Sequence, residues 1–149
     1  MAAAGYPARF LHTCRKEAAS AHWFRRYYRK RRSFMRVLIV DDEAFAADTL
    51  AMLLRGRGHE VIVAHDGATG IAIGVAGAID AAVVDLGLGG VDGYAVAKEL
   101  RAHYGSHLTL IAYTGFSRVE VQLRAKEHGF NRVILKPATV GSIVAALAE

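Results

Sequence analysis

An apolar run that ends in two adjacent carboxylates constrains the fold of this chain more than any other stretch. Residues 37–40 are all valine, leucine or isoleucine, and they lead directly into Asp41 and Asp42. Such a short unbroken run is typical of a strand that is buried on both faces, as in a parallel sheet. The two carboxylates then follow the C-terminal end of that strand, and open α/β sheets bind their ligands at this edge.

The adjacent carboxylates indicate a cation site. Two neighbouring negative charges repel each other unless a cation lies between them, and sites made only of oxygen ligands suit a hard ion such as Mg²⁺. Taken alone, Asp41, Asp42 and Glu43 are explained equally well as a solvated triplet that caps the following helix. The remaining strands therefore decide between these two interpretations.

From Met35 onward, apolar runs alternate with segments of helical periodicity. Further strands are predicted at residues 61–64, 81–84, 108–113 and 133–135. Most of the helices are predicted from apolar residues at helical spacing, which are Ala46, Leu50 and Leu53 in the first, Ala68, Ile71, Ala72 and Val75 in the second, Val96, Ala97, Leu100 and Tyr104 in the third, and Val140, Ile143, Val144 and Leu147 in the last.

The ends of two helices are predicted from their capping residues. Asp92 is the expected N-cap of the third helix. Ser117 and Glu120 have the spacing of a capping box, which predicts the start of the fourth helix, and Gly129 predicts its end. The second helix has the weakest pattern, because the two glycines inside it each cost about 1 kcal/mol relative to alanine.

Five strands that alternate with five helices predict an α/β fold of the flavodoxin-like (βα)₅ type. In this fold a five-stranded parallel sheet is covered by helices on both faces. The natural strand order is 2-1-3-4-5, which places the topological switch point between strands one and three. Residues 35–149 are expected to form this domain.

The polar residues at the strand ends converge in this topology. Asp41 and Asp42 follow strand one, Asp85 follows strand three, Thr114 ends strand four, and Lys136 follows strand five. Three carboxylates at the switch point repel one another unless a divalent cation and an ammonium balance their charge. A cation, a lysine and a nucleophilic carboxylate suit phosphoryl transfer. Each residue alone has an ordinary explanation, such as a helix cap or a surface lysine, but their joint occurrence favours a functional site.

Residues 35–149 resemble the receiver domain of response regulators in two-component signalling. The resemblance extends over the whole domain and is carried by four segments in the same order. These are Val-Leu-Ile-Val-Asp-Asp-Glu from residue 37, Val-Val-Asp-Leu-Gly-Leu-Gly-Gly-Val-Asp-Gly-Tyr from residue 83, Ile-Ala-Tyr-Thr-Gly from residue 111 and Leu-Lys-Pro-Ala from residue 135.

The resemblance implies a role for each residue of the site. Asp85 accepts a phosphoryl group from a histidine kinase or a histidine phosphotransfer protein. Asp41, Asp42 and Asp85 hold Mg²⁺ together with the backbone carbonyl of Gly87. Lys136 pairs with Asp85 and then with its phosphoryl group. The protein is then a phosphoacceptor that assists its own phosphorylation and dephosphorylation, and it is not an enzyme that turns over a separate substrate.

The resemblance also implies a switch, and here the sequence departs from the family. Thr114 is expected to move toward the phosphoryl group, and the peptide bond before Pro137 is expected to be cis. The family usually has an aromatic residue at the position of Val133, so the coupling of Thr114 to the output surface must use another side chain or be weaker. Gly89 replaces a proline and Gly115 an alanine, and both changes leave their loops more flexible.

Two further residues predict the lifetime of the phosphorylated form. Gly87 and Phe116 stand two residues after Asp85 and Thr114, where they are expected to flank the line of attack on the phosphoryl group. Neither residue has a group that orients a water molecule, and Phe116 is able to shield the site. We therefore expect slow hydrolysis of the aspartyl phosphate.

The N-terminal segment, residues 1–34, differs from the rest in charge. It has nine Arg and Lys residues and one Glu, which gives a formal charge of +8, whereas the rest of the chain carries −3. Its aromatic residues alternate with arginines, a pattern that suits a salt-sensitive nucleic-acid arm, an anionic membrane surface or an organellar transit peptide. We favour a disordered extension without a fixed role, or a leader from a start codon placed too early.

The remaining expectations concern the setting of the protein. The chain has 53% hydrophobic and 22% charged residues, which is typical of a soluble globular domain, and its single cysteine, Cys14, fits a reducing, cytoplasmic compartment. We expect a stand-alone switch that contacts its target through residues 117–129, 133–135 and 140–147, and a homodimer is a further candidate assembly. The alternatives are a nucleic-acid-binding regulator, a mononucleotide-binding protein and a phosphatase with an aspartate nucleophile.

Overall fold

The computed structural model describes residues 34–149. The interpretations of the basic N-terminal segment and of Cys14 concern residues that lie outside the described part of the chain. The strands are β1 (Arg36–Val40), β2 (Glu60–Ala64), β3 (Ala81–Val84), β4 (Thr109–Thr114) and β5 (Arg132–Leu135). The helices are α2 (Ala44–Arg55), α3 (Gly67–Ala76), α4 (Gly93–Tyr104), α5 (Val119–Glu127) and α6 (Val140–Leu147), and a short 3₁₀ turn, η1 (Gly105–His107), precedes β4.

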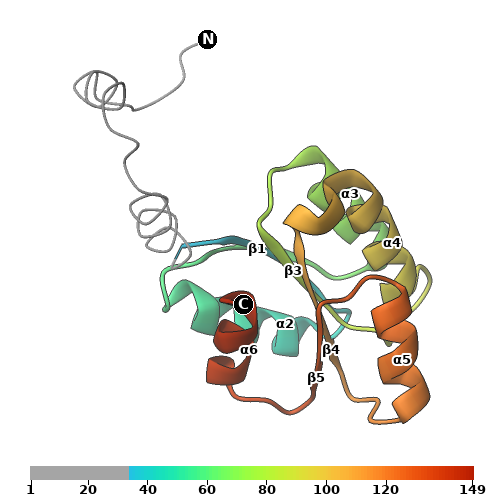
Figure 1. Cartoon of the computed structure of the whole chain (residues 1–149). Coiled ribbons are helices and arrows are strands. Elements are labelled where there is room, and N and C mark those ends of the chain that lie inside the picture. The colour runs from blue at the N-terminus through green and yellow to red at the C-terminus, as the bar shows by residue number, and fades with distance from the viewer. Residues whose placement is uncertain (1–33) are drawn as a thin grey trace, which may run out of the picture. The chain divides into compact units, whose positions relative to one another are not determined.

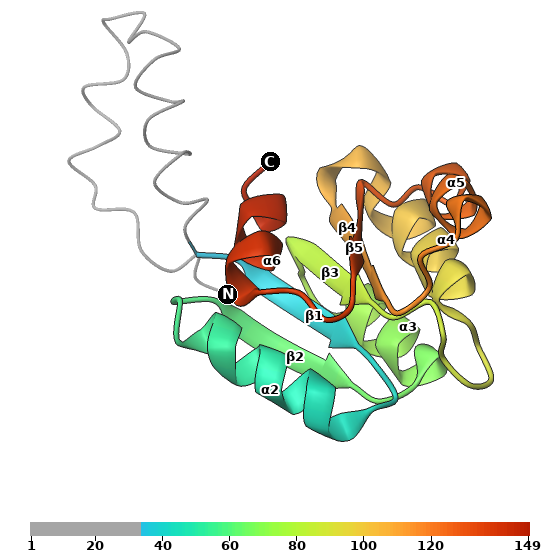
Figure 2. The ribbon, with the colours of Figure 1, turned by 90° about the horizontal axis from the view of Figure 1, so that it is seen from below.

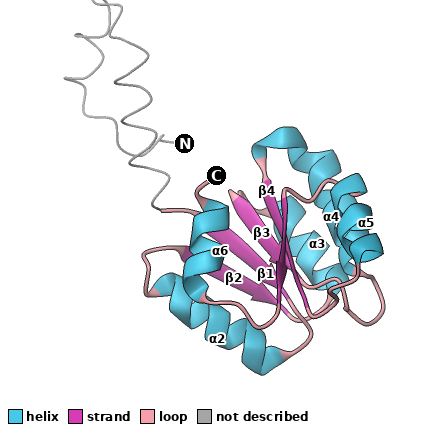
Figure 3. Cartoon of the chain, turned by 60° about the horizontal axis from the view of Figure 1, so that its bottom comes forward, coloured by secondary structure: helices cyan, strands magenta, loops and turns pink. Residues whose placement is uncertain are grey.

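The five strands form one parallel sheet in the order β2-β1-β3-β4-β5, which confirms the predicted fold class and topology (Figure 3). The register aligns the ends of β2, β1 and β3 near the site, because Val40 lies opposite both Ala64 and Val84. Two backbone hydrogen bonds extend this register by one residue. The Asp85 N–H donates to the Val40 carbonyl over 2.9 Å, and the Asp41 N–H donates to the Ala64 carbonyl over 3.1 Å. The residues that follow β1 and β3 are therefore neighbours.

The helices form a layer on each face of the sheet. Helices α2 and α6 lie on one side, and α3, α4 and α5 lie on the other (Figure 1), as the view from below also shows (Figure 2). Successive strand residues point to opposite faces, so Val37 and Ile39 pack under α2, while Leu38 and Val40 pack under α3 and α4. Strands β1 and β3 are buried on both sides, which is why residues 37–40 and 81–84 are uninterrupted apolar runs.

Helix α3 packs through a different face from the one its sequence predicts. Its buried residues are Gly67, Gly70 and Gly74, whereas the predicted apolar face is partly or largely exposed and includes Val75 at 39%. A Cβ atom built on Gly70 would lie 2.7 Å from Cγ2 of Val40, too close for any side chain there. The glycines therefore let the helix approach the sheet closely, and this approach overrides the periodicity of the larger residues.

Two smaller expectations are also wrong. In α2 the predicted face included Leu53, which is 42% exposed, because the helix is turned so that Leu54 meets the sheet instead. The residues of α2 that the structure buries are Ala47, Leu50, Ala51 and Leu54. Helix α5 begins at Val119 with Arg118 at the N-cap position and without a side-chain cap, so Ser117 stands one residue too early for the predicted capping box.

Other helix ends agree with prediction. The Asp92 carboxylate accepts a hydrogen bond from the Ala95 N–H over 2.8 Å and caps α4. Gly129 follows the end of α5 with a φ of 86°, a conformation that glycine adopts without strain. Within residues 34–149, no helix is long and apolar enough to cross a membrane.

Candidate functional site

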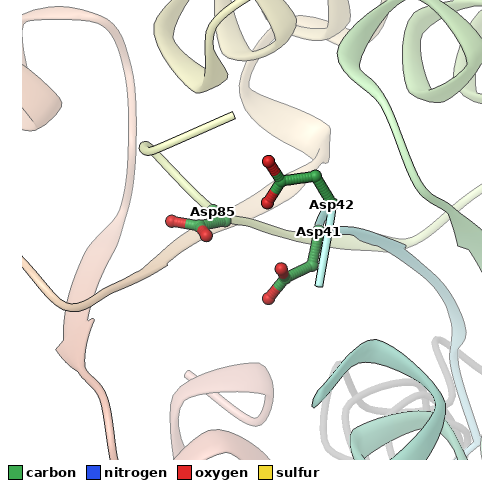
Figure 4. A group of neighbouring side chains, drawn as sticks. All are labelled: Asp41, Asp42 and Asp85. Atoms are coloured by element: carbon green, nitrogen blue, oxygen red, sulfur yellow. The ribbon is translucent and has the colours of Figure 1, made fainter. Parts of the chain in front are cut away.

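Three carboxylates gather where β1 and β3 end. Asp41 and Asp42 follow β1 and Asp85 follows β3, and each offers an oxygen such that the three atoms lie within 4.8 Å of one another (Figure 4). Asp41 is buried, Asp85 is half-buried and Asp42 is exposed. The site therefore has a buried end, formed by Asp41, and an end that is open to solvent, formed by Asp42.

Backbone hydrogen bonds hold two of these carboxylates in place. The Glu43 N–H donates to Oδ1 of Asp41 over 2.9 Å, and the Gly87 N–H donates to Oδ1 of Asp85 over the same distance. In both residues this bond leaves Oδ2 available for a second partner. The turns that follow β1 and β3 thus orient the two carboxylates in the same way.

The ammonium of Lys136 is that second partner for both. Its Nζ lies 2.6 Å from Oδ2 of Asp41 and 3.1 Å from Oδ2 of Asp85, and only 21% of the lysine side chain is exposed. Burial lowers the pKa of Lys136, but the hydrogen bonds and charges of the two carboxylates outweigh it and raise the pKa above the usual value of 10.5. The lysine is therefore positively charged throughout the physiological pH range.

The residues of the site suit a divalent cation. Three carboxylates and one ammonium leave a formal charge of −2 in a small volume. All the available ligand atoms of the cluster are oxygens, which hard ions such as Mg²⁺ prefer, and the exposed Asp42 side leaves room for the water molecules that Mg²⁺ retains. The cluster thus has the charge, the ligand type and the access that Mg²⁺ requires.

Thr114 and Phe116 occupy the loop that follows β4. Thr114 is fully buried, and its hydroxyl oxygen accepts a hydrogen bond from the Phe116 N–H over 3.3 Å. The Phe116 ring is 54% exposed and lies against Gly87, because a Cβ atom built on that glycine would be 3.2 Å from Cε2 of the ring and 3.6 Å from Oδ1 of Asp85. The ring therefore borders the β3–α4 loop close to Asp85.

The remaining predicted residues lie on or beside β5. Val133 is half-buried and packs against the core on the sheet face that α3, α4 and α5 cover, opposite Ala112 of β4. The peptide bond between Lys136 and Pro137 is cis, as the resemblance implies. The backbone N–H of Lys136 donates to the Thr114 carbonyl over 2.8 Å, so the chain after β5 stays tied to β4 up to the lysine.

Two features of the site are not among the expectations drawn from the sequence. The shorter lysine contact is to Asp41, whereas the resemblance implies a pairing of Lys136 with Asp85. In addition, the Lys136 Nζ lies 5.2 Å from the centre of the Tyr113 ring. Strand alternation is the signal that could have identified Tyr113, because it places this residue on the sheet face that Lys136 also uses.

The family comparison agrees with this geometry. The sequence profile of the response regulator receiver domain matches residues 37–148, which include every residue of the site. The chain belongs to the response-regulator receiver family. It therefore carries a signalling domain of two-component systems, and its predicted family and fold are confirmed.

Curated relatives place the receiver domain within longer proteins. The chain is 34% identical over 111 residues to the sensory transduction protein RegX3 of Mycolicibacterium smegmatis, a match that covers 74% of this chain and 48% of the relative. It is 27% identical over 113 residues to the response regulator MprA of Mycobacterium avium, covering 76% and 49%. The chain thus spans about half the length of these relatives.

Solved receiver structures share the fold. A response regulator of Burkholderia pseudomallei, described with a phosphorylated aspartic acid, a calcium ion and citrate, matches with a TM-score of 0.71 and 30% identity over 75% of this chain and 65% of that one. The chemotaxis protein CheY4 of Vibrio cholerae matches with a TM-score of 0.72 and 22% identity over 76% and 96%. The second likeness concerns the fold alone.

Proposed function

We propose that this receiver domain is a phosphorylation-dependent switch whose phosphoacceptor is Asp85. The observation that carries the proposal is the position of the Lys136 ammonium, which bonds to both Asp41 and Asp85, while Asp42 offers a third carboxylate to the same cluster. A lysine that is already in contact with the acceptor can also contact the oxygens of a phosphoryl group on it. A purely structural ion pair would be neutral, whereas this acidic cluster keeps a negative charge that Lys136 does not balance. The arrangement therefore suits phosphoryl transfer better than a purely structural role.

The transfer step uses the Asp85 carboxylate as nucleophile. One of its oxygens attacks the phosphorus atom of a phosphorylated histidine, so that an O–P bond forms and the N–P bond breaks. The electron pair of the broken bond stays on the imidazole nitrogen, which takes up a proton from solvent. The products are an aspartyl phosphate and a neutral histidine, and Asp85 is phosphorylated once without turnover of a separate substrate.

The surrounding groups offset the charge of the transferred phosphoryl group. Lys136 supplies one positive charge and is held by Asp41 in the position where that charge is needed. When bound, Mg²⁺ supplies further positive charge, and its ligands in this proposal are Asp41, Asp42, Asp85 and the backbone carbonyl of Gly87. The half-buried position of Asp85 strengthens these interactions relative to those in bulk water.

The switch transmits the phosphorylated state to a protein surface. Thr114 is proposed to move its hydroxyl from the Phe116 N–H toward the phosphoryl group, which would alter the β4–α5 loop. The output surface in this proposal comprises α5, β5 and α6, and it exposes Val119 at 66% and Leu123 at 59%. Because Val133 replaces the usual aromatic residue, the movement of this loop itself, rather than the rotation of a β5 ring, is proposed to carry the change.

The phosphoryl donor in this proposal is a sensor histidine kinase or a histidine phosphotransfer protein, and the proposed location of the domain is the cytoplasm. The target is a downstream protein or a second copy of the domain. Support comes from the family assignment and from the similarity to a sensory transduction protein and a response regulator.

A mass measurement tests the proposal. The purified protein is treated with acetyl phosphate and Mg²⁺, and its intact mass is followed. We expect the addition of one phosphate that is stable in acid and released by base or hydroxylamine, as an acyl phosphate is. The Asp85→Ala variant should remain unmodified, whereas Asp48→Ala, which removes an exposed carboxylate of α2 away from the site, should be modified like the wild type. A phosphate that persists in Asp85→Ala would exclude this acceptor.

Phe116 provides a second test through the lifetime of the aspartyl phosphate. Its ring borders Gly87 and carries no group that orients water, and in this proposal it shields the approach to Asp85. We expect slow hydrolysis in the wild type and faster hydrolysis in Phe116→Glu, because a carboxylate there can orient an attacking water molecule. A half-life of seconds that Phe116→Glu leaves unchanged would contradict this part of the proposal.

A further inference from the structure

Lys136 reaches its partners across a neighbouring strand. The lysine follows β5, whereas Asp41 and Asp85 follow β1 and β3, and β4 lies between β5 and β3. Neighbouring strands are about 4.8 Å apart, so the side chains of Lys136 and Asp85 together bridge roughly 10 Å between β5 and β3. The four-carbon stem of the lysine is flexible and would sample many other directions in solution. A group on β4 that lies under this stem could therefore guide it.

Tyr113 is the residue of β4 in that position. It pairs in register with Ile134 of β5, two residues before the lysine, and both pack against the apolar cluster under α2 and α6. Strand alternation directs Lys136 to the same face as Ile134, and directs Thr114 to the opposite one. The Lys136 Nζ lies 5.2 Å from the centre of the Tyr113 ring, within the range of an attraction between a cation and an aromatic face.

We propose that Tyr113 is a positioning residue that holds the ammonium of Lys136 over the phosphoacceptor. This inference rests on the proposed phosphorylation of Asp85. The aromatic face favours the charged end of the lysine where it crosses β4, and Asp41 and Asp85 then bind it at its far end. Tyr113 contacts no reacting atom in this arrangement, so its effect on the rate passes through Lys136.

A ring-preserving and a ring-removing variant separate this role from simple packing. Tyr113→Phe keeps the aromatic face and removes only the hydroxyl, whereas Tyr113→Leu keeps an apolar side chain and removes the ring. With acetyl phosphate and Mg²⁺, we expect Tyr113→Phe to be phosphorylated at the wild-type rate and Tyr113→Leu about fivefold more slowly, the change that corresponds to a modest cation–aromatic attraction. Equal rates in Tyr113→Leu and Tyr113→Phe would overturn the proposal.

A double-mutant cycle tests whether the effect passes through the lysine. In a Lys136→Met background the ring has no ammonium to hold, so Tyr113→Leu should produce no further slowing. The same fivefold loss in that background would overturn the proposal and assign Tyr113 to packing. If the wild type itself takes up no phosphate, the proposed function fails first, which is distinguishable from a failure of this inference.

A spectroscopic measurement tests the contact without any phosphorylation. The ε-methylene protons of Lys136, assigned by their loss in Lys136→Met, should show an upfield shift caused by the Tyr113 ring current. We expect this shift in the wild type and in Tyr113→Phe, and its loss in Tyr113→Leu. A lysine signal at the same position in all three proteins would show that the ring does not hold the side chain, and would overturn the proposal even if Tyr113→Leu slowed phosphorylation.

Discussion

Helices α3 and α5 cover the same face of the sheet but are held against it in opposite ways. Helix α3 buries three glycines and contacts the sheet through its own backbone, so close that Gly70 leaves no space for a side chain. Helix α5 buries only Ala125 and exposes the apolar side chains of Val119 and Leu123. Helix α3 is thus fixed by its close fit against the sheet, whereas α5 presents much of its apolar surface to solvent.

A few contacts from α4 hold the region of α5. The Arg124 guanidinium lies 4.2 Å from the centre of the Tyr94 ring, and the His128 ring is 5.0 Å from the same ring. Beyond the helix, Arg101 of α4 binds the chain that leads to β5. A segment with few buried groups changes position at a lower free-energy cost than a tightly packed one. Helix α3 therefore provides rigid support, whereas α5 is able to change its position, which is consistent with the proposed output surface.

The largest effect on the free energy of unfolding is expected from a substitution at the buried glycines of α3. Gly70→Ala would place a Cβ 2.7 Å from Cγ2 of Val40, a stiff side chain in the core, so we expect a loss of about 1–3 kcal/mol in the free energy of unfolding. In α6, Gly141 is exposed and the nearest atom to such a Cβ is 3.6 Å away, so Gly141→Ala should gain about 0.5 kcal/mol. Urea unfolding measures both. Stabilisation by both substitutions would show that α3 does not pack through its glycines.

A comparable or smaller loss in the free energy of unfolding is expected when the hydrogen bonds from Arg101 to the chain after α5 are removed. The Arg101 side chain donates to the carbonyls of Gly105 and Gly129, both over 2.5 Å, to that of Leu108 over 2.8 Å, and to the Asn131 side chain over 3.0 Å. Arg101→Met leaves these acceptors without that donor, and we expect a loss of about 1–3 kcal/mol in urea unfolding. Hydrogen exchange should accelerate at Asn131. Arg101→Lys should recover only part of the loss, and a full recovery would contradict the role of the forked guanidinium.

The N-terminus of α3 adds a pH dependence to the stability of the protein. The Thr69 backbone N–H donates to Asp66 over 2.7 Å and is the main cause that lowers the pKa of Asp66 below its usual 3.8. The folded state thus favours the charged carboxylate, so this stabilisation is present above the usual pKa and is lost as the pH falls through the lowered pKa of the folded state. Between about pH 5 and pH 3, the wild type should lose stability more steeply than Asp66→Asn, which keeps a capping oxygen without titrating. Parallel pH curves of the two proteins would contradict this assignment.

The smallest expected effect is at the exposed surface of α5. Leu123→Ser replaces a side chain that is 59% exposed, so the free energy of unfolding should change by less than about 0.5 kcal/mol. Val119→Ser, at 66% exposure, serves as a second variant of the same kind. A loss above about 1 kcal/mol in either one would show that α5 packs more tightly than its exposure indicates.

The strands were predictable because burial on both faces leaves a local signal. Residues 81–84 and 133–135 are short apolar runs, and the structure places β3 and β5 there, with β5 one residue longer at its start. The packing face of α3 was not predictable in this way. Hydrophobic periodicity weighs the large residues, whereas the tight contact depends on the absence of side chains at Gly70 and Gly74 opposite Val40 and Leu100, which lie in other elements.

The sequence by itself determined which strand ends carry acidic, hydroxyl and amino groups, and the parallel order of the strands. Those properties follow from local patterns of burial and from the rules that connect strands through helices. Only the tertiary structure decided that the Lys136 ammonium contacts Asp41 more closely than Asp85 and passes near the ring of Tyr113. Lys136 and Asp41 are 95 residues apart. Their contact depends on strand spacing and on side-chain rotamers in the packed site, which no local pattern in the sequence records.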